Sequence, residues 1–344
     1  MSGKPVIVFD KVSLYVEGRR FLDRADLVVS EGESLVVAGA GGCGKSFVLR
    51  LVLGLPGMGR ASVRVEGDVV VDGHSILAEP LPALQRRRRN MGSVMSGGGL
   101  IENMDVRKNI ALPLNYHYGN VMSTAEIEAR CDAILGDMEL EELALPGRRP
   151  VSLNRMERIY VALARALVNQ PNILLIDEPT TGVSAAAGER LARFCFYYRP
   201  EFPSAPAAME EMSGRPMTRI ITTVELEPYL DFGHRFALLA NGKIEEIGDR
   251  EAVLGSADPN VRELLSRSRN VASPGVDDAD SAELPRGGEL LAPVGLPLVS
   301  PGRSSKGRGG RGKWQDSASS LNPRPAIFWW AFSFCWRPPV LAGC

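Results

Sequence analysis

One stretch of eight residues has the composition and the spacing of a phosphate-binding loop. It fits G-x-x-x-x-G-K-[ST] without a mismatch, follows the apolar run at 34–38 and precedes an apolar helical pattern. Its glycines allow successive backbone N–H groups to face one anion, and the helix start adds the positive end of its dipole. We therefore expect Lys45 to reach the β- and γ-phosphates of a nucleotide and the Ser46 hydroxyl to ligate Mg²⁺. The loop consists of Gly39, Ala40, Gly41, Gly42, Cys43, Gly44, Lys45 and Ser46.

Two carboxylates follow a second apolar run and are the candidates for catalysis. Residues 173–176 predict a buried strand that ends at Asp177, and Glu178 comes next. An acid at the end of a strand beside a phosphate loop can hold the Mg²⁺ shell, which is the role expected for Asp177. Glu178 is placed to take a proton from an attacking water. Two acids can also simply solvate the end of a strand, but the nearby phosphate loop favours the catalytic interpretation.

The elements that must position these residues alternate between strands and helices. The first 75 residues are rich in short apolar strands, residues 100–170 have a mainly helical pattern, and a hairpin is expected at Asn241-Gly242. Strands alternating with helices around a phosphate loop predict an α/β fold. The expected strands lie at 6–9, 34–38, 69–71, 173–177 and 219–224.

Composition argues against several classes of protein. The 344 residues are 44% hydrophobic and 24% charged, as in ordinary globular proteins, and 40 basic against 41 acidic residues give a net charge of -1. That balance argues against a dedicated nucleic-acid binder. Five dispersed cysteines without a CxxC pair, together with three histidines, argue against a zinc site or a disulfide framework. There is no signal-peptide pattern and no apolar window of about 18 residues, so we expect a cytoplasmic protein.

The chain changes character toward its end. Residues 1–268 are expected to form the folded nucleotide-binding domain, with a helical subdomain at about 97–165. Residues 269–344 are rich in proline and glycine and are expected to be disordered, because such a segment buries too little apolar surface. The aromatic stretch at 326–336 could lie in a membrane interface or have no function. The basic run at 86–89 is expected to be solvated, with contact to lipid headgroups or an acidic protein patch as the alternative.

The stretch LLIDEPTTG at 174–182, at this distance after the phosphate loop, resembles the nucleotide-binding subunits of ABC transporters. The resemblance covers about residues 5–266 and implies a P-loop NTPase cassette with a RecA-like core, an antiparallel β subdomain and a helical subdomain. It implies ATP and Mg²⁺ as ligands, Glu178 as the catalytic residue and Tyr15 as the aromatic side chain that stacks on adenine. The implied partners are an integral membrane permease and a second cassette, on the inner face of the cell membrane.

Two further stretches are similar to the ATPases of MCE-associated (Mla-type) lipid transporters. They are GLIENMDVRKNIALPL at 99–114 and SADPNVRELL at 256–265. This similarity implies phospholipid as the transported substrate and an MCE-type lipid-binding protein as a further partner. The function expected from the resemblance is therefore binding and hydrolysis of MgATP to power transmembrane transport.

Four positions depart from the pattern of that family. Ser96 stands where a Gln is expected to help place Mg²⁺ and the attacking water, and Ser184 stands where an acid is expected. Val224 stands where a His is expected to contact the γ-phosphate, and Val has no hydrogen-bonding group. The LSGGQ signature, with which a second cassette completes the nucleotide site, is replaced by Leu153, Asn154, Arg155, Met156 and Glu157.

These departures leave more than one function open. The first is an ATPase subunit that powers transport, and the second is a non-hydrolysing, ATP-binding regulatory subunit of a heterodimeric ABC complex. Positioning and electrostatics supply most of phosphoryl-transfer catalysis, so loss of the Gln and the His favours the second. A third reading, a soluble ABC ATPase of repair or translation, usually has two cassettes in one chain, and the single cassette here counts against it. Turnover that depends on Glu178 separates the first two functions.

Overall fold

The structure is a computed structural model that describes residues 3–57, 62–198, 200 and 215–270. The chain divides into compact units at Met1–Asp280 and Ser281–Cys344, and every described residue belongs to the first of them. The tail expected at 269–344 therefore lies outside the described residues, apart from residues 269 and 270. The disorder of this tail, and the membrane-interface location considered for its aromatic stretch, stay predictions.

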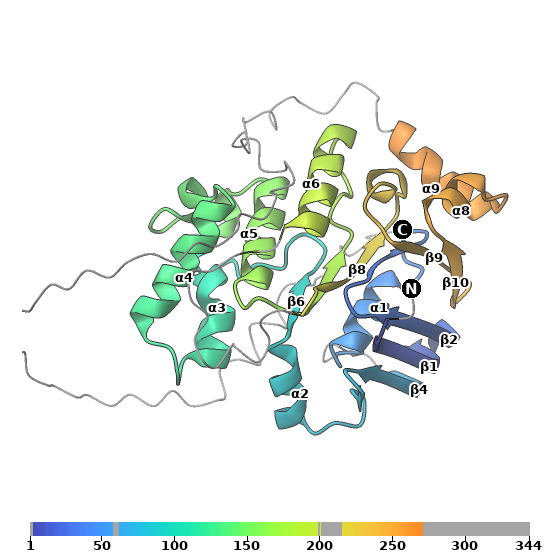
Figure 1. Cartoon of the computed structure of the whole chain (residues 1–344), viewed down its shortest axis with the longest axis horizontal. Coiled ribbons are helices and arrows are strands. Elements are labelled where there is room, and N and C mark those ends of the chain that lie inside the picture. Colours follow the sequence, from blue (N-terminus) through green and yellow to red (C-terminus); the bar gives the residue numbers. More distant parts are fainter. Residues whose placement is uncertain (1–2, 58–61, 199, 201–214, 271–344) are drawn as a thin grey trace, which may run out of the picture. The chain divides into compact units, whose positions relative to one another are not determined.

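A six-stranded sheet forms the centre of the described unit (Figure 1). The strand order is β10-β9-β3-β8-β7-β6, and all neighbours are parallel except β10, which is antiparallel to β9. Strands β3 and β7 are buried at every residue, which explains their continuous apolar sequences. Ligands of such sheets bind at the carboxyl ends of the strands. The strands are β3 (Ser34–Ala38), β6 (Met91–Val94), β7 (Ile173–Asp177), β8 (Thr218–Thr223), β9 (Arg235–Ala240) and β10 (Lys243–Gly248).

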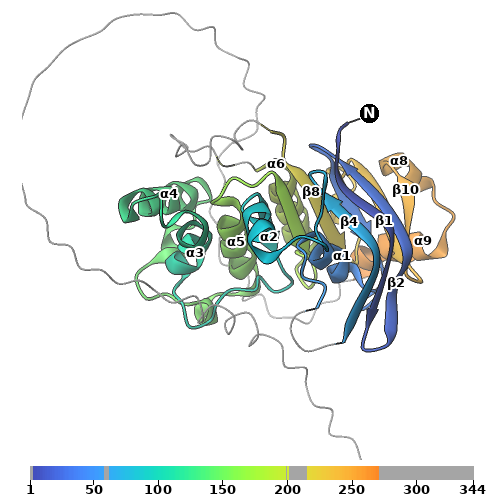
Figure 2. The same cartoon turned by 90° about the horizontal axis from the view of Figure 1, so that it is seen from below.

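A second, antiparallel sheet packs against the first through helix α1 (Lys45–Val52) (Figure 2). Its strand order is β2-β1-β4-β5. Val48 and Leu49 of α1 belong to one hydrophobic cluster with Leu14 of β1 and Leu175 of β7. Helix α1 is therefore held on both sides, and its start fixes the position of the phosphate loop. The strands are β1 (Pro5–Val16), β2 (Arg19–Ser30), β4 (Val63–Val71) and β5 (His74–Ser75).

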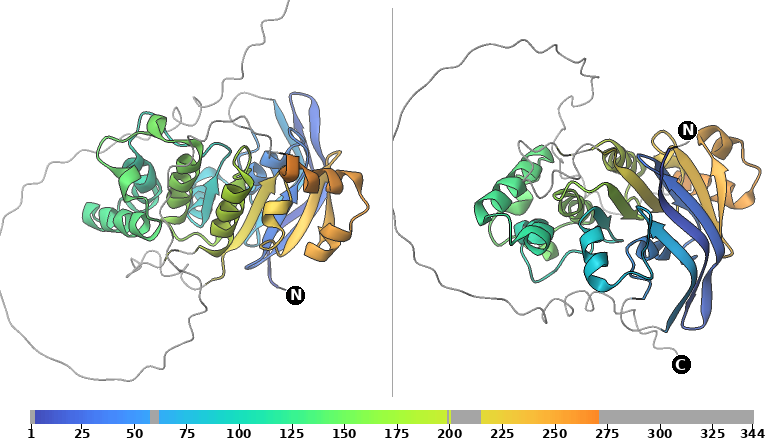
Figure 3. Two further views of the ribbon diagram at one scale, coloured as in Figure 1. Left: turned by 90° about the horizontal axis from the view of Figure 1, so that it is seen from above. Right: turned by 60° about the horizontal axis from the view of Figure 1, so that its bottom comes forward.

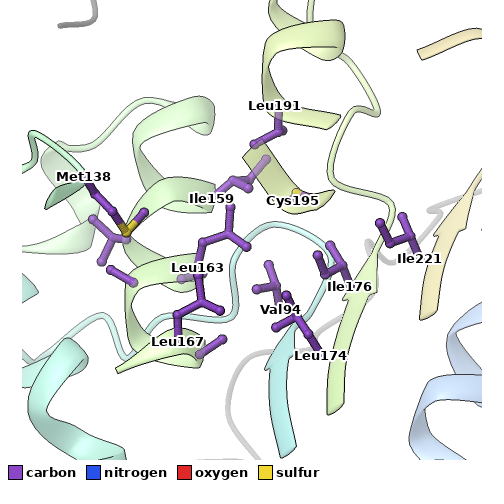
Figure 4. Packing of buried hydrophobic residues seen from close by; sticks show 14 of the residues in the cluster. Val94, Met138, Ile159, Leu163, Leu167, Leu174, Ile176, Leu191, Cys195 and Ile221 are labelled. Carbon is purple, nitrogen blue, oxygen red and sulfur yellow. The ribbon is translucent and has the colours of Figure 1, made fainter. Parts of the chain in front are cut away.

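Helices cover the opposite face of the six-stranded sheet (Figure 3). Ile159, Leu163 and Leu167 follow one another at helical spacing along α5 and belong to one hydrophobic cluster with Val94 and Ile176 of the sheet (Figure 4). This stripe holds α5 against the sheet, while α3 and α4 lie beyond it. The helices are α3 (Val106–Tyr118), α4 (Thr124–Asp137), α5 (Arg155–Leu167) and α6 (Ala185–Tyr197).

The α/β fold, the antiparallel sheet and the mainly helical stretch expected from the sequence are confirmed. Among the described residues, none of the helices has the length and apolarity needed to cross a membrane. The remaining elements are α2 (Leu81–Arg88), η1 (Glu141–Ala144), η2 (Pro150–Ser152), η3 (Glu227–Tyr229), α8 (Arg250–Gly255) and α9 (Pro259–Asn270).

The basic run at 86–89 is expected from its sequence to face solvent, but most of its side chains contact other residues of the chain. Arg87 pairs with Glu79 at 2.6 Å, and Arg89 lies over the ring of Tyr118 at 5.7 Å. Arg88 donates to the carbonyl oxygens of residues 53 and 54, at the end of α1. Three of the four guanidinium groups therefore contact other parts of the chain.

Candidate functional site

The phosphate loop joins the end of β3 to α1, and glycine is required at several of its positions. Gly42 and Gly44 have φ angles of 72° and 114°, which side-chain-bearing residues rarely adopt. A Cβ on Gly39 would lie 2.6 Å from the carbonyl oxygen of Leu239 and 2.8 Å from Cys43 Sγ. Burial raises the pKa of that thiol, so Cys43 is neutral near pH 7. The loop can therefore hold this shape only with these glycines in place.

We expect Gly39→Ala to lower the free energy of unfolding by about 1–3 kcal/mol, because the new methyl group overlaps a backbone carbonyl that has little freedom to move. Gly41→Ala is the matched control, since a Cβ there meets no atom within 4 Å. Urea unfolding of both variants without nucleotide measures the difference. Equal stability of the two variants would contradict this account of the loop.

The side chain of Lys45 is folded into the loop and is 1% exposed. Its Nζ donates to the carbonyl oxygens of Gly39 at 2.9 Å and Ala40 at 2.8 Å. It also forms an ion pair with Glu178 Oε1 at 3.0 Å. A buried ammonium group beside backbone N–H groups at a helix start provides the positive charge that bound phosphates need.

The carboxylate of Asp177 lies beside the first turn of α1. Ser46 Oγ donates to Asp177 Oδ1 at 3.0 Å, and Thr222 Oγ1 donates to the same oxygen at 2.7 Å. The structure therefore brings together Ser46 and Asp177, which are 131 positions apart in the sequence. Thr222 was not singled out from the sequence, because its role depends on the pairing of β7 with β8.

The oxygens of Ser46 and Asp177 fit Mg²⁺. This ion prefers oxygen ligands, and proteins often hold it through one or two carboxylates while nucleotide phosphates and water complete its shell. Within the described part of the chain, no cluster of three or more His, Cys, Asp or Glu side chains forms a metal site. A hydroxyl and a single carboxylate next to a phosphate loop match a metal that arrives with its nucleotide.

Glu178 occupies an unusual backbone conformation next to Asp177. Its φ angle is 48°, in the left-handed region, and its N–H donates to the carbonyl oxygen of Thr222 at 3.0 Å. This conformation turns the carboxylate toward Lys45. The four residues expected to do chemistry, Lys45, Ser46, Asp177 and Glu178, thus form one continuous site.

An aromatic ring also lies against the loop, and it belongs to Phe21. The β1–β2 register shifts between the Leu14–Leu22 and Tyr15–Arg20 pairs, which leaves Phe21 as the extra residue of a bulge. A Cβ on Gly44 would lie 3.3 Å from Phe21 Cδ1. Both rings have a guanidinium over them, since Tyr15, the aromatic expected from the sequence, has Arg64 at 4.2 Å and Phe21 has Arg19 at 4.7 Å. The proximity of Phe21 to Gly44 is therefore what makes it a second candidate for stacking on adenine.

We expect Phe21→Ala to weaken adenine nucleotide binding about tenfold, because stacking of a base on an aromatic ring contributes roughly 1–3 kcal/mol. Tyr15→Ala is expected to change the affinity little. Calorimetric titration with ATP and with inorganic triphosphate measures both, and only ATP should be affected. A larger loss in Tyr15→Ala would instead support the assignment made from the sequence.

The start of α5, where an altered signature is expected from the sequence, is capped by its own side chains. Asn154 Oδ1 accepts a hydrogen bond from the N–H of Glu157 at 2.9 Å, and the Glu157 carboxylate accepts one from the N–H of Asn154 at 2.8 Å. This capping box satisfies helix donors and places a negative charge at the helix start. Arg148 pairs with that carboxylate at 3.5 Å. Arg155, by contrast, is exposed.

The other three positions expected to depart from the family pattern, Ser184, Val224 and Ser96, lie in three different parts of the structure. Ser184 caps α6 by accepting a hydrogen bond from the N–H of Ala187 at 3.4 Å. Val224 is half-buried directly after β8. Ser96 precedes three glycines with positive φ, and Arg165 of α5 donates to the carbonyl oxygens of the second and third of them. Among the described residues, no hydrogen bond or ion pair joins any of these three to Lys45 or to the two acids.

Comparison with known proteins is consistent with this site. A family model described as ABC transporter matches residues 22–181. The sulfate/thiosulfate import ATP-binding protein CysA of Caulobacter vibrioides is 34% identical over 233 residues, 67% of this chain and 61% of its own length. The sulfate/thiosulfate import ATP-binding protein cysA of Cucumis sativus is 30% identical, over 77% of this chain and 70% of its own. The spermidine/putrescine import ATP-binding protein PotA of Methylococcus capsulatus is 29% identical, over 72% of this chain and 57% of its own length.

The solved structures similar to this chain are also ATP-binding cassettes. The dimeric ATP-binding cassette MJ0796, in a post-hydrolysis state bound to ADP and Pi, superposes with a TM-score of 0.57 and 27% identity, over 70% of this chain and 98% of its own. A nucleotide-free ATP-binding cassette from an ABC transporter superposes with a TM-score of 0.56 over 76% of this chain and 98% of its own. At 19% identity, this similarity supports only the assignment of the fold. The chain spans about three fifths of the length of the bacterial CysA and PotA relatives that it matches.

Proposed function

Because this chain belongs to the ABC transporter family of ATP-binding proteins, we propose that it is the ATP-binding subunit of a transporter and that it hydrolyses MgATP to power transport. The observation that carries the proposal is the convergence of Lys45, Ser46, Asp177 and Glu178 at the carboxyl ends of β3 and β7. A phosphate-binding loop, an oxygen pair for Mg²⁺ and a second carboxylate that can accept a proton are the parts that phosphoryl transfer to water needs.

Each residue has a defined role in that reaction. Lys45 exchanges its bonds to Gly39, Ala40 and Glu178 for the β- and γ-phosphate oxygens. Ser46 and Asp177 would hold Mg²⁺, which when bound neutralises phosphate charge. The water oxygen bonds to the γ-phosphorus and the bond to the bridging oxygen breaks, so that ADP and inorganic phosphate form. Glu178 accepts the proton that the water loses.

The transported substrate that we propose is a small charged solute. The relatives described above are named for import of sulfate and thiosulfate or of spermidine and putrescine. None of those names supports the phospholipid or the MCE-type partner expected from residues 99–114 and 256–265. The partners we propose are a membrane permease, which would place the chain at the inner face of the cell membrane, and a second cassette, because MJ0796 is dimeric.

A second function, a non-hydrolysing regulatory subunit, is favoured by one specific observation. The Glu157 carboxylate occupies the start of α5, so that helix end is less suited to bind the phosphate of a partner's nucleotide. Co-purification of the chain with its permease, followed by reconstitution of the complex into lipid vesicles, tests the proposed transport. Substrate flux driven by ATP, and lost in a Glu178→Gln complex, is the expected result. ATP-bound complexes without Glu178-dependent flux would support the regulatory function instead.

A further inference from the structure

A buried tyrosine lies behind the catalytic carboxylate, in the loop after β8. Tyr229 ends the short helix η3 and is 0% exposed. Burial raises the pKa of its hydroxyl, so the group remains a protonated donor. It donates to Thr180 Oγ1 at 3.0 Å. A hydroxyl of this kind joins two segments that are far apart in the sequence.

Thr180 follows Glu178 closely in the sequence, and a second threonine, Thr223, is the last residue of β8. Thr180 lies two positions after Glu178, and Thr223 comes directly before Val224, which offers no hydrogen-bonding side chain. Both threonines are almost completely buried. The hydroxyl of Thr223 is held by the backbone of Glu225, with distances of 2.7 Å to its carbonyl oxygen and 3.0 Å from its N–H.

The end of β8, at Thr222 and Thr223, is hydrogen-bonded to the phosphate loop and to the acids. The carbonyl oxygen of Thr223 accepts from the N–H of Gly39 at 3.1 Å. Thr222 contacts Asp177 through its hydroxyl and Glu178 through its carbonyl oxygen. The end of β8 is therefore held by several hydrogen bonds, and the Tyr229 hydroxyl links η3, which follows β8 in the chain, to the segment after Glu178.

We propose that Tyr229 is a positioning residue that holds the segment after Glu178 against η3 through its hydrogen bond to Thr180. The strained φ of Glu178 needs such restraint, because a left-handed conformation at a non-glycine residue relaxes when its surroundings loosen. A purely structural role would rest on the ring, which packs near Phe196 at 6.2 Å, and would not need the hydroxyl. The catalytic part of the proposal depends on the hydrolytic function proposed above.

The variant Tyr229→Phe removes the hydroxyl and keeps the ring. We expect the kcat of ATP hydrolysis to fall about tenfold with an unchanged KM, because nucleotide is held by other residues while the carboxylate is misplaced. Thr180→Val should have a similar effect, and the double variant should be no worse than either single one. Tyr118→Phe is the matched control, since Tyr118 is equally buried and its hydroxyl has no partner among the described residues.

Hydrogen exchange tests the same link without any turnover. We expect the amides of Glu178 and Thr181 to exchange about tenfold faster in Tyr229→Phe and at the wild-type rate in Tyr118→Phe. Unchanged amide exchange in Tyr229→Phe would overturn the proposal. An equal loss of kcat in Tyr118→Phe would also overturn it, as would faster exchange in Tyr229→Phe with a wild-type kcat. A wild-type chain without Glu178-dependent turnover would instead refute the hydrolytic function, and the exchange rates would still decide the link.

Discussion

Replacement of Glu178 by Gln is expected to lower the rate of ATP hydrolysis about 100- to 10,000-fold, the range typical of a lost general base. The amide keeps the size of the side chain but no longer takes a proton from water. The Lys45, Ser46 and Asp177 side chains remain in place, so we expect the affinity for MgATP to be retained. Steady-state phosphate release and a parallel binding titration measure the two effects.

Glu66→Gln is a suitable control for this substitution. Glu66 lies in β4 with its side chain 51% exposed, and its ion pair with Arg64 is on the surface, where such pairs contribute little. The control should keep wild-type turnover. If Glu178→Gln were as active as Glu66→Gln, the carboxylate would not be the base and the roles assigned to the site would be wrong.

Substitution of Lys45 by Met is the second large effect, and it acts on binding. We expect the Kd for MgATP to rise about 100-fold or more, corresponding to roughly 2.7 kcal/mol. The ammonium is 1% exposed, so no water or mobile cation takes its place beside the phosphates. Isothermal titration of the wild type and the variant gives this number directly.

The control for that titration is Lys11→Met, because the side chain of Lys11 is 63% exposed and forms an ion pair with Asp10 on the surface. Circular dichroism and thermal unfolding show whether the Lys45 variant keeps its fold, since the substitution leaves Glu178 and two loop carbonyls without their partner. A folded Lys45→Met protein with wild-type affinity would mean that nucleotide binds elsewhere.

The parts of this site that the sequence predicts are those whose chemistry is local. The spacing of Gly39 and Lys45 within one loop, and of Asp177 after an apolar strand, identifies phosphate and metal ligands without reference to any other element. The α/β fold follows from the alternation of strands and helices for the same reason. The structure brings these segments together as expected.

The parts that the sequence misses depend on registers and long-range pairing. Phe21 faces the loop only because a bulge shifts β1 against β2, and no periodicity in the sequence indicates that bulge. Thr222 reaches Asp177 only because β8 pairs with β7, and Tyr229 reaches Thr180, which is 49 positions away in the sequence, only through the fold. The pattern N-x-x-E at Asn154, by contrast, is a local capping signal that could have been found.

An equilibrium titration of the wild-type chain with ATP, in Mg²⁺ and in EDTA, tests the central claim most directly. The claim is that Lys45, Ser46 and Asp177 form one MgATP site. We expect saturable binding with one nucleotide per chain and an affinity at least about tenfold higher with Mg²⁺, because the hydroxyl and carboxylate oxygens then share the ion with the phosphates. Absence of saturable binding, or identical isotherms with and without Mg²⁺, would contradict the account.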